Sequence, residues 1–124
     1  MGKTILIVDD EPNIVESLEF LMKREGFDTV VACDGEAALF AMEASKADLV
    51  LLDVMMPKKD GYEVCRQIRA TPKWQQAKVI MLSAKSRDTE IAKGLAVGAD
   101  AYVTKPFSSK ELVQQVNRVL GIRP

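Results

Sequence analysis

The feature that most constrains the fold is an unbroken aliphatic run, residues 49–52, that ends directly in Asp53. Such a run is typical of a strand buried on both faces, as parallel strands covered by helices are. Pro57 and the turn-forming residues 58–61 end the pattern before a helical stretch begins. An ionised carboxylate at the mouth of a buried strand costs free energy unless a charge or a hydrogen-bonding group meets it. The partners of Asp53 should therefore indicate the function.

Similar apolar runs alternate with helical patterns along the whole chain. Strands are predicted at residues 4–8, 29–32, 49–53, 79–82 and 101–104; helices are predicted from Pro12 to a stop at Gly26, at about 36–44, 61–70 and 88–96, and after a cap at Ser108 or Ser109. Strict alternation implies a parallel sheet with helices on both faces and right-handed crossovers. The strand order 2-1-3-4-5 suits five strands without a dinucleotide-binding glycine loop. Residues 1–124 are thus predicted to form one α/β domain, a flavodoxin-like doubly wound (βα)5 with a five-stranded parallel sheet.

The composition excludes several classes of function. At 124 residues with 48% hydrophobic and 28% charged residues, the chain can bury a single core. The formal net charge is −1 and no long basic run occurs, so no direct contact with nucleic acid is expected. The first apolar run, residues 5–8, is far too short for a signal peptide or a membrane-spanning helix. We expect a cytoplasmic protein without a membrane partner.

The chain contains no histidine and two cysteines. The lack of histidine excludes Ser-His-Asp and Cys-His catalysis, histidine-containing zinc sites and histidine pH switches. Cys33 and Cys65 lie far apart without a Cys-x-x-Cys spacing, so both are predicted to be reduced. Any chemistry must run on carboxylates, hydroxyls and amines.

Polar side chains follow four of the five predicted strands: Asp9 and Asp10, Asp53, Ser83 and Lys105. In the predicted order the first and third strands are neighbours, and all strand ends open onto one edge. Three carboxylates that close cannot all stay ionised without a cation. Oxygen ligands without histidine or cysteine favour Mg²⁺.

The same set suits a phosphoryl group. Lys105 adds a positive charge, Ser83 adds a hydroxyl donor, and Asp53 would be the nucleophile that forms an acyl phosphate. Taken singly, each residue has a common structural explanation as a turn, cap or surface residue. The joint arrangement favours metal-assisted phosphoryl transfer.

Four motifs resemble those of the receiver domain of two-component response regulators. They are Ile7-Val8-Asp9-Asp10-Glu11-Pro12, Leu51-Leu52-Asp53-Val54-Met55-Met56-Pro57 with Asp60-Gly61, Ser83-Ala84, and Gly98-Ala99-Asp100-Ala101-Tyr102-Val103-Thr104-Lys105-Pro106-Phe107. The resemblance implies that Asp53 is the phosphoacceptor and that Asp10 binds Mg²⁺ directly. It also implies that Asp9 acts near the metal through water, and that the backbone carbonyl of Met55 completes the protein ligands.

The resemblance also implies a switch. Lys105 would pair with the phosphoryl group and precede a cis peptide bond to Pro106. The Ser83 hydroxyl would move to a phosphoryl oxygen and the Tyr102 ring would fill the vacated space. This repacks the surface of the fourth helix, fifth strand and fifth helix. Met55 and Lys85 stand where the family tunes the lifetime of the acyl phosphate.

The phosphoryl donor must act in trans because the chain has no histidine: a sensor histidine kinase or a phosphotransfer protein, with small acyl phosphates as substitutes. The domain is expected to be a phosphoacceptor that catalyses only its own phosphorylation and dephosphorylation, and not otherwise an enzyme. Its target is a downstream protein or a fused output domain. Receivers that drive winged-helix transcription factors resemble one another in a charged dimer face between the fourth and fifth helices. This chain has Ile91 and Ala101 where that face would carry charged residues. We therefore expect a monomer or a weak dimer through the fourth helix, fifth strand and fifth helix.

Three alternatives have different sequence requirements. A haloacid-dehalogenase-type phosphatase needs a second aspartate where this chain has Met55. A flavodoxin-like cofactor binder needs a glycine- or hydroxyl-rich loop after the first strand, which here is acidic. A degenerate receiver would act as an unphosphorylated interaction module. The chain ends at residues 121–124, directly after the last helix, as a stand-alone receiver or part of a longer regulator would.

Overall fold

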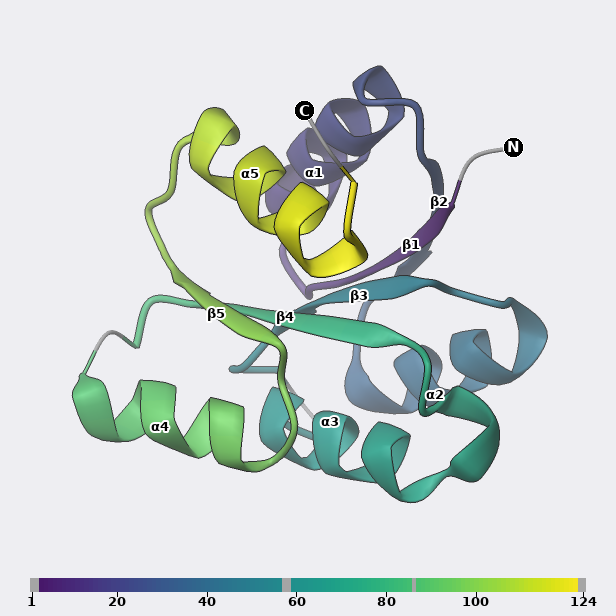
Figure 1. Cartoon of the computed structure of the whole chain (residues 1–124), viewed down its shortest axis with the longest axis vertical. Helices are drawn as coiled ribbons and strands as arrows, with labels where there is room; N and C mark the ends of the chain where they lie inside the picture. The colour runs from purple at the N-terminus through teal and green to yellow at the C-terminus, as the bar shows by residue number, and fades with distance from the viewer. Residues whose placement is uncertain (1–2, 57–58, 86, 123–124) are drawn as a thin grey trace.

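The computed structural model describes residues 3–56, 59–85 and 87–122, and within them strands and helices alternate (Figure 1). The strands are β1 (Thr4–Val8), β2 (Asp28–Ala32), β3 (Leu49–Asp53), β4 (Lys78–Ser83) and β5 (Ala101–Thr104). The helices are α1 (Pro12–Arg24), α2 (Gly35–Ala44), α3 (Gly61–Ala70), α4 (Asp88–Ala96) and α5 (Ser109–Leu120), with a short 3-10 helix η1 (Pro72–Trp74). Pro57 and Lys58, predicted to begin the turn after the third strand, lie outside the described residues, as do the last two residues of the chain.

The five strands form one parallel sheet in the order β2-β1-β3-β4-β5, which confirms the predicted topology. In this register Val8 of β1 pairs with Leu52 of β3. The residues that follow, Asp9 and Asp53, therefore emerge side by side at the carboxyl edge of the sheet. Ser83 pairs with Thr104 at the same edge.

Helices cover both faces of the sheet: α1 and α5 lie on one side, and α2, α3 and α4 on the other (Figure 1). Strand residues alternate between the two cores. Ile7 and Leu51 belong to the core under α1 and α5, while Leu6 and Leu52 belong to the opposite one. All four are fully buried, as expected for aliphatic strands between two helical layers. Burial of each such side chain contributes about 1.5–3 kcal/mol.

The helix starts follow their cap residues. Ser108 accepts a hydrogen bond from the backbone N–H of Glu111, as its sequence pattern predicts, and Asp60 caps α3 in the same way. Residues 71–74, predicted as a loop, instead contain η1. The φ angle that Pro72 imposes suits a first helical position, and the N–H of Trp74 donates to the Thr71 carbonyl at 3.0 Å.

Cys33 is exposed and Cys65 is buried, and both thiols are free. Burial raises the pKa of the Cys65 thiol to about 11, so this thiol stays protonated and packs as a small apolar residue. Among the described residues, none of the helices has the length and apolar character needed to cross a membrane.

Candidate functional site

Three carboxylates meet at the carboxyl edge of the sheet. Asp9 directly follows β1 and Asp53 is the last residue of β3. One carboxylate oxygen from each of Asp9, Asp10 and Asp53 lies within 4.8 Å of the others. Asp9 and Asp53 are only 1% and 6% exposed, whereas Asp10 is open to solvent. The strand order thus brings Asp53 beside Asp9 and Asp10, which lie far from it in the sequence.

Lys105 supplies the positive charge of the site. Its Nζ lies 3.2 Å from Asp9 Oδ2 and 3.5 Å from Asp53 Oδ1. The backbone N–H of Lys105 donates to the Ser83 carbonyl at 2.8 Å, which fixes the start of the loop after β5. The Lys105–Pro106 peptide bond is cis, as predicted.

Burial is the main influence on the charges of the site. It raises the pKa of the Asp53 carboxyl from 3.8 to about 6; the Asp9 charge adds to this rise, and the Lys105 charge opposes it. For Lys105, burial alone would lower the pKa, but the charges of Asp53 and Asp9 outweigh burial and raise it. Lys105 is therefore a cation at neutral pH. Asp53 carries a charge that its buried surroundings disfavour, and this charge is available to a cation or an electrophile.

The donor set fits Mg²⁺. Three carboxylates converge in the cluster, and the Lys105 ammonium pairs with two of them, Asp9 and Asp53, which leaves negative charge for a divalent cation. Asp9 Oδ1 accepts the N–H of Glu11 at 2.9 Å, so the Asp9 side chain is held in place. Met55 lies in the loop two residues after Asp53, and its side chain is exposed. That the Met55 backbone carbonyl is a metal ligand stays a prediction.

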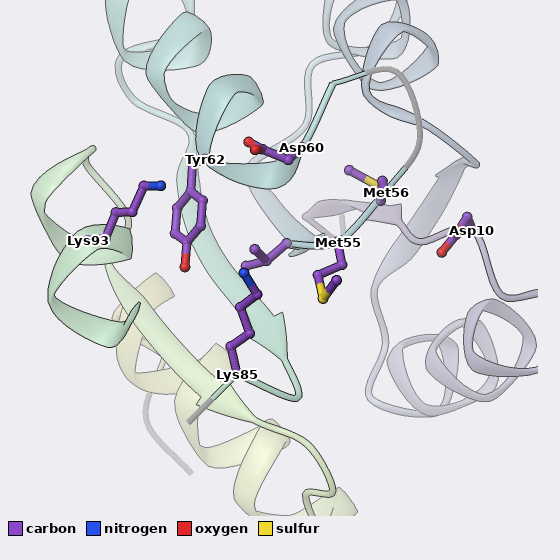
Figure 2. A pocket seen from close by; sticks show the side chains of 8 residues that line it. Asp10, Met55, Met56, Asp60, Tyr62, Lys85 and Lys93 are labelled. Carbon is purple, nitrogen blue, oxygen red and sulfur yellow. The ribbon is translucent and has the colours of Figure 1, made fainter. Parts of the chain in front are cut away.

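A pocket of about 430 Å³ opens beside the acidic cluster. Figure 2 shows Met55 between Asp10 on one side and Tyr62 and Lys93 on the other. The Lys93 ammonium lies 4.4 Å from the centre of the Tyr62 ring, a cation–π contact between α4 and α3. Tyr62 and Lys93 were not predicted from the sequence, because nothing in their local pattern separates them from ordinary helix residues.

Ser83 and Tyr102 are connected through one residue. The N–H of Lys85 donates to Ser83 Oγ at 3.0 Å, and the Tyr102 hydroxyl donates to the Lys85 carbonyl at 2.9 Å. Ser83 is buried at the acidic edge, and Tyr102 is half-buried in β5. Both predicted switch residues thus contact the same short segment after β4.

Comparison with known proteins gives a consistent family. A family model described as the response regulator receiver domain matches residues 5–117. The alkaline phosphatase synthesis transcriptional regulatory protein PhoP of Bacillus subtilis (strain 168) is 46% identical over 120 residues, which are 97% of this chain and 49% of that protein. The chain spans about half the length of this relative.

Two solved structures agree with this family over nearly the whole chain. The receiver domain of the Francisella response regulator 1452 is 34% identical with a TM-score of 0.90, and the match covers 97% of this chain and 98% of that one. A BeF3-activated DrrB receiver domain is 36% identical with a TM-score of 0.87, covering 98% and 99%. The chain belongs to the response regulator receiver domain family of two-component systems.

Proposed function

We propose that this receiver domain accepts a phosphoryl group on Asp53 with the help of Mg²⁺ and transmits the change to a partner through α4, β5 and α5. The observation that carries the proposal is the convergence of three carboxylates within 4.8 Å, with the Lys105 ammonium 3.5 Å from Asp53. A purely structural acidic cluster would not need a buried carboxylate paired with a half-buried cation.

The chemistry follows from the positions of these groups. An Asp53 oxygen attacks phosphorus; an O–P bond forms while the N–P bond of a phosphohistidine breaks, and the histidine nitrogen keeps the electron pair. Asp9, Asp10, Asp53 and the Met55 carbonyl would hold Mg²⁺. The bound ion would offset the negative charge of the phosphoryl oxygens. Lys105 would neutralise a further phosphoryl oxygen.

Ser83 would couple the acyl phosphate to Tyr102. Its hydroxyl oxygen accepts the N–H of Lys85, so a turn of this hydroxyl toward a phosphoryl oxygen would disturb the Lys85 backbone. Tyr102 donates to that same backbone and would respond. The expected result is a change in the surface of α4, β5 and α5 that a partner would bind.

The donor is expected to be a sensor histidine kinase or a phosphotransfer protein, because the chain has no histidine of its own. The domain would catalyse only its own phosphorylation and dephosphorylation. One relative is named a transcriptional regulatory protein, and the chain matches half of it. This supports a fused output domain over a separate target. A cytoplasmic location stays a prediction.

The direct test is the intact mass of the protein after incubation with acetyl phosphate, with and without Mg²⁺. Wild type should gain the mass of one phosphoryl group only when Mg²⁺ is present, and Asp53→Asn should gain none. Asp28→Asn is a matched control, since this exposed acid begins β2 at the opposite edge of the sheet. It should behave as wild type.

Other results would change the proposal. Phosphoryl addition to Asp53→Asn would place the acceptor elsewhere. No addition to wild type, together with no binding of Mg²⁺, would leave the alternative of an unphosphorylated interaction module.

A further inference from the structure

Helix α4 contacts the sheet through a residue without a side chain. Every residue of α4 is described, and Gly94 alone among them is buried. In Figure 1 the helix lies under the β4 and β5 side of the sheet. An amphipathic helix normally buries a stripe of apolar side chains. The space that such a side chain of α4 would occupy must be filled from the sheet.

The Tyr102 ring fills that space. Tyr102 of β5 pairs with Met81 of β4, and both pack into the core that α2 and α3 cover. A Cβ atom built on Gly94 would lie 2.7 Å from Tyr102 Cδ2, 3.0 Å from Tyr102 Cε2 and 2.9 Å from Met81 Sδ. Distances below 3.0 Å are not tolerated, so any side chain at this position requires a neighbour to move.

We infer that Gly94 is the position in α4 that admits the Tyr102 ring, and that the residue here sets the balance between an inward and an outward ring. The inference deepens the proposed function, since it concerns the ring that would report the acyl phosphate. It identifies a positioning residue that contacts neither Asp53 nor the metal cluster.

Tyr102 is the neighbour expected to yield. Met81 is completely buried, so its Sδ atom can shift away from position 94 only into the space that the Tyr102 ring leaves. Tyr102 is half-buried on β5, an edge strand of the sheet, so its ring can turn toward solvent. An outward turn breaks the hydrogen bond from the Tyr102 hydroxyl to the Lys85 carbonyl. A methyl group at position 94 therefore disconnects the ring from the segment that Ser83 contacts.

The experiment measures the solvent exposure of the Tyr102 ring by NMR, as relaxation from a soluble paramagnetic agent in protein with labelled tyrosine. The chain has two tyrosines, and a Tyr62→Phe variant assigns the signals. The proteins compared are wild type, Gly94→Ala, Tyr102→Ala and the double variant. Ala92→Gly is the matched control, because Ala92 is an exposed residue of the same helix.

In Gly94→Ala we expect a several-fold rise in paramagnetic relaxation at Tyr102 and a smaller change at Tyr62, whose hydroxyl interacts with Tyr102. The urea midpoint should fall in Gly94→Ala relative to wild type. It should rise when the same change is made in Tyr102→Ala, because alanine is the better helix former once the ring is absent. Ala92→Gly should lower the midpoint and leave the Tyr102 ring inside.

A Tyr102 ring that stays protected in Gly94→Ala overturns the inference, as does an equal loss of stability in both backgrounds. If Gly94→Ala does not fold, folding of the double variant supports the clash, and failure of both contradicts it. These readouts need no phosphorylation. Intact mass after acetyl phosphate and Mg²⁺ tests Asp53 separately: we expect Gly94→Ala to be phosphorylated as wild type is, with its Tyr102 ring exposed before and after.

Discussion

The Lys105 ammonium lies 3.5 Å from Asp53 Oδ1, although Asp53 ends β3, Lys105 follows β5, and β4 lies between these two strands. The lysine side chain thus reaches across one strand to the acidic cluster. Both side chains are largely buried, at 18% and 8% exposure. A pair of this kind is weak evidence for net stabilisation, but loss of one partner leaves a buried charge unpaired.

Lys105→Met should therefore destabilise the metal-free protein by about 3 kcal/mol at pH 8, because Asp9 and Asp53 lose their shared cation. The loss should be smaller at pH 5, where Asp53 is protonated. Urea unfolding in the presence of a chelator measures both values. Lys110→Met, at an exposed position of α5, is the control and should change stability by less than about 0.5 kcal/mol. An equal loss in both variants would contradict the pairing.

The raised pKa of Asp53 predicts an unusual pH dependence for the metal-free protein. The folded state binds the Asp53 proton more tightly than the unfolded state, because the pKa is about 6 in the fold and 3.8 ordinarily. Stability from this group is therefore present at pH 4 and is lost as the pH rises through 6. Each pKa unit corresponds to about 1.4 kcal/mol, so the effect is at most about 3 kcal/mol.

The check is the free energy of unfolding from pH 4.5 to 8, in wild type and in Asp53→Asn. The fall in the free energy of unfolding between pH 4.5 and 8 that Asp53 causes should be absent from Asp53→Asn. This variant should be the more stable protein at pH 8. The same slope in both proteins would mean that Asp53 does not titrate in this range.

Metal binding should compete with the Asp53 proton. Mg²⁺ needs an ionised carboxylate, so its apparent affinity should fall as the pH drops below about 6. Added Mg²⁺ should raise the melting temperature at pH 8 and have little effect at pH 5. Asp9→Asn and Asp53→Asn should weaken the shift at pH 8, and Asp28→Asn should retain it. A shift that does not depend on these carboxylates would place the ion elsewhere.

The fold could be predicted from local patterns because each element carries its own signal. The aliphatic run before Asp53 can only be accommodated between two helical layers, and Ser108 marks the start of α5 by its hydrogen-bonding chemistry. The strand order then followed from a rule on alternating elements, and it brought Asp9 next to Asp53. Residues at strand ends are therefore predictable as a group.

Contacts across the chain could not be predicted in this way. From the sequence alone, Gly94 is only a glycine that lowers the helix propensity of α4. The structure shows that the Tyr102 ring packs against it. Tyr62 and Lys93 meet only because α3 and α4 are neighbours on one face of the sheet. Such relationships depend on how side chains interdigitate, and interdigitation has no periodic signal in the sequence.

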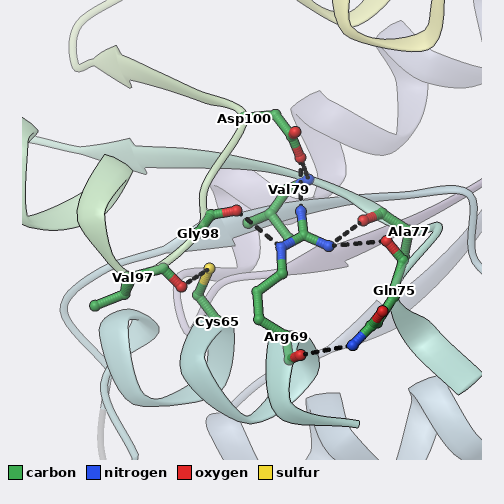
Figure 3. A network of polar contacts seen from close by, with 8 residues as sticks. All are labelled: Cys65, Arg69, Gln75, Ala77, Val79, Val97, Gly98 and Asp100. Carbon is green, nitrogen blue, oxygen red and sulfur yellow. Dashed lines mark hydrogen bonds and ion pairs between the residues drawn. The ribbon is translucent and has the colours of Figure 1, made fainter. Parts of the chain in front are cut away.

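Arg69 of α3 is a further residue whose importance is visible only in the structure (Figure 3). Its guanidinium donates to the Gly98 carbonyl at 2.8 Å, the Ala77 carbonyl at 2.7 Å and Asp100 Oδ2 at 2.7 Å. Asp100 Oδ2 also accepts the N–H of Val79. One side chain thus holds the segments that precede β4 and β5.

Arg69→Ala should lower the free energy of unfolding by about 1–3 kcal/mol, because the Gly98 and Ala77 carbonyls and Asp100 lose a charged donor. Arg66→Ala is the matched control: Arg66 lies on the same helix and pairs with Glu63 in solvent, where such a pair contributes about 0–1 kcal/mol. Urea unfolding compares the two variants. Equal losses would show that the Arg69 network adds no more than an exposed ion pair.

Gly61 begins α3 directly against the end of β3, the strand that carries Asp53. Its N–H donates to the Val54 carbonyl at 2.8 Å. A Cβ atom here would lie 2.8 Å from Val54 Cα and 3.1 Å from the Asp53 carbonyl carbon, and closer still to the Asp53 carbonyl oxygen. These are backbone atoms, which cannot turn aside as the end of a flexible side chain can.

Gly61→Ala should therefore displace Asp53 from the acidic cluster. We expect a loss of about 2–3 kcal/mol in stability and a clearly weaker Mg²⁺-induced rise in melting temperature. Gly121→Ala is the control that distinguishes a steric clash from an unfavourable backbone conformation. Gly121 has a φ of 73°, but nothing lies within 4 Å of its Cβ position. That variant should lose about 1 kcal/mol and keep the full response to Mg²⁺. If Gly61→Ala also keeps it, the start of α3 does not position Asp53, and the geometry of the cluster must be maintained by β1 and β3 alone.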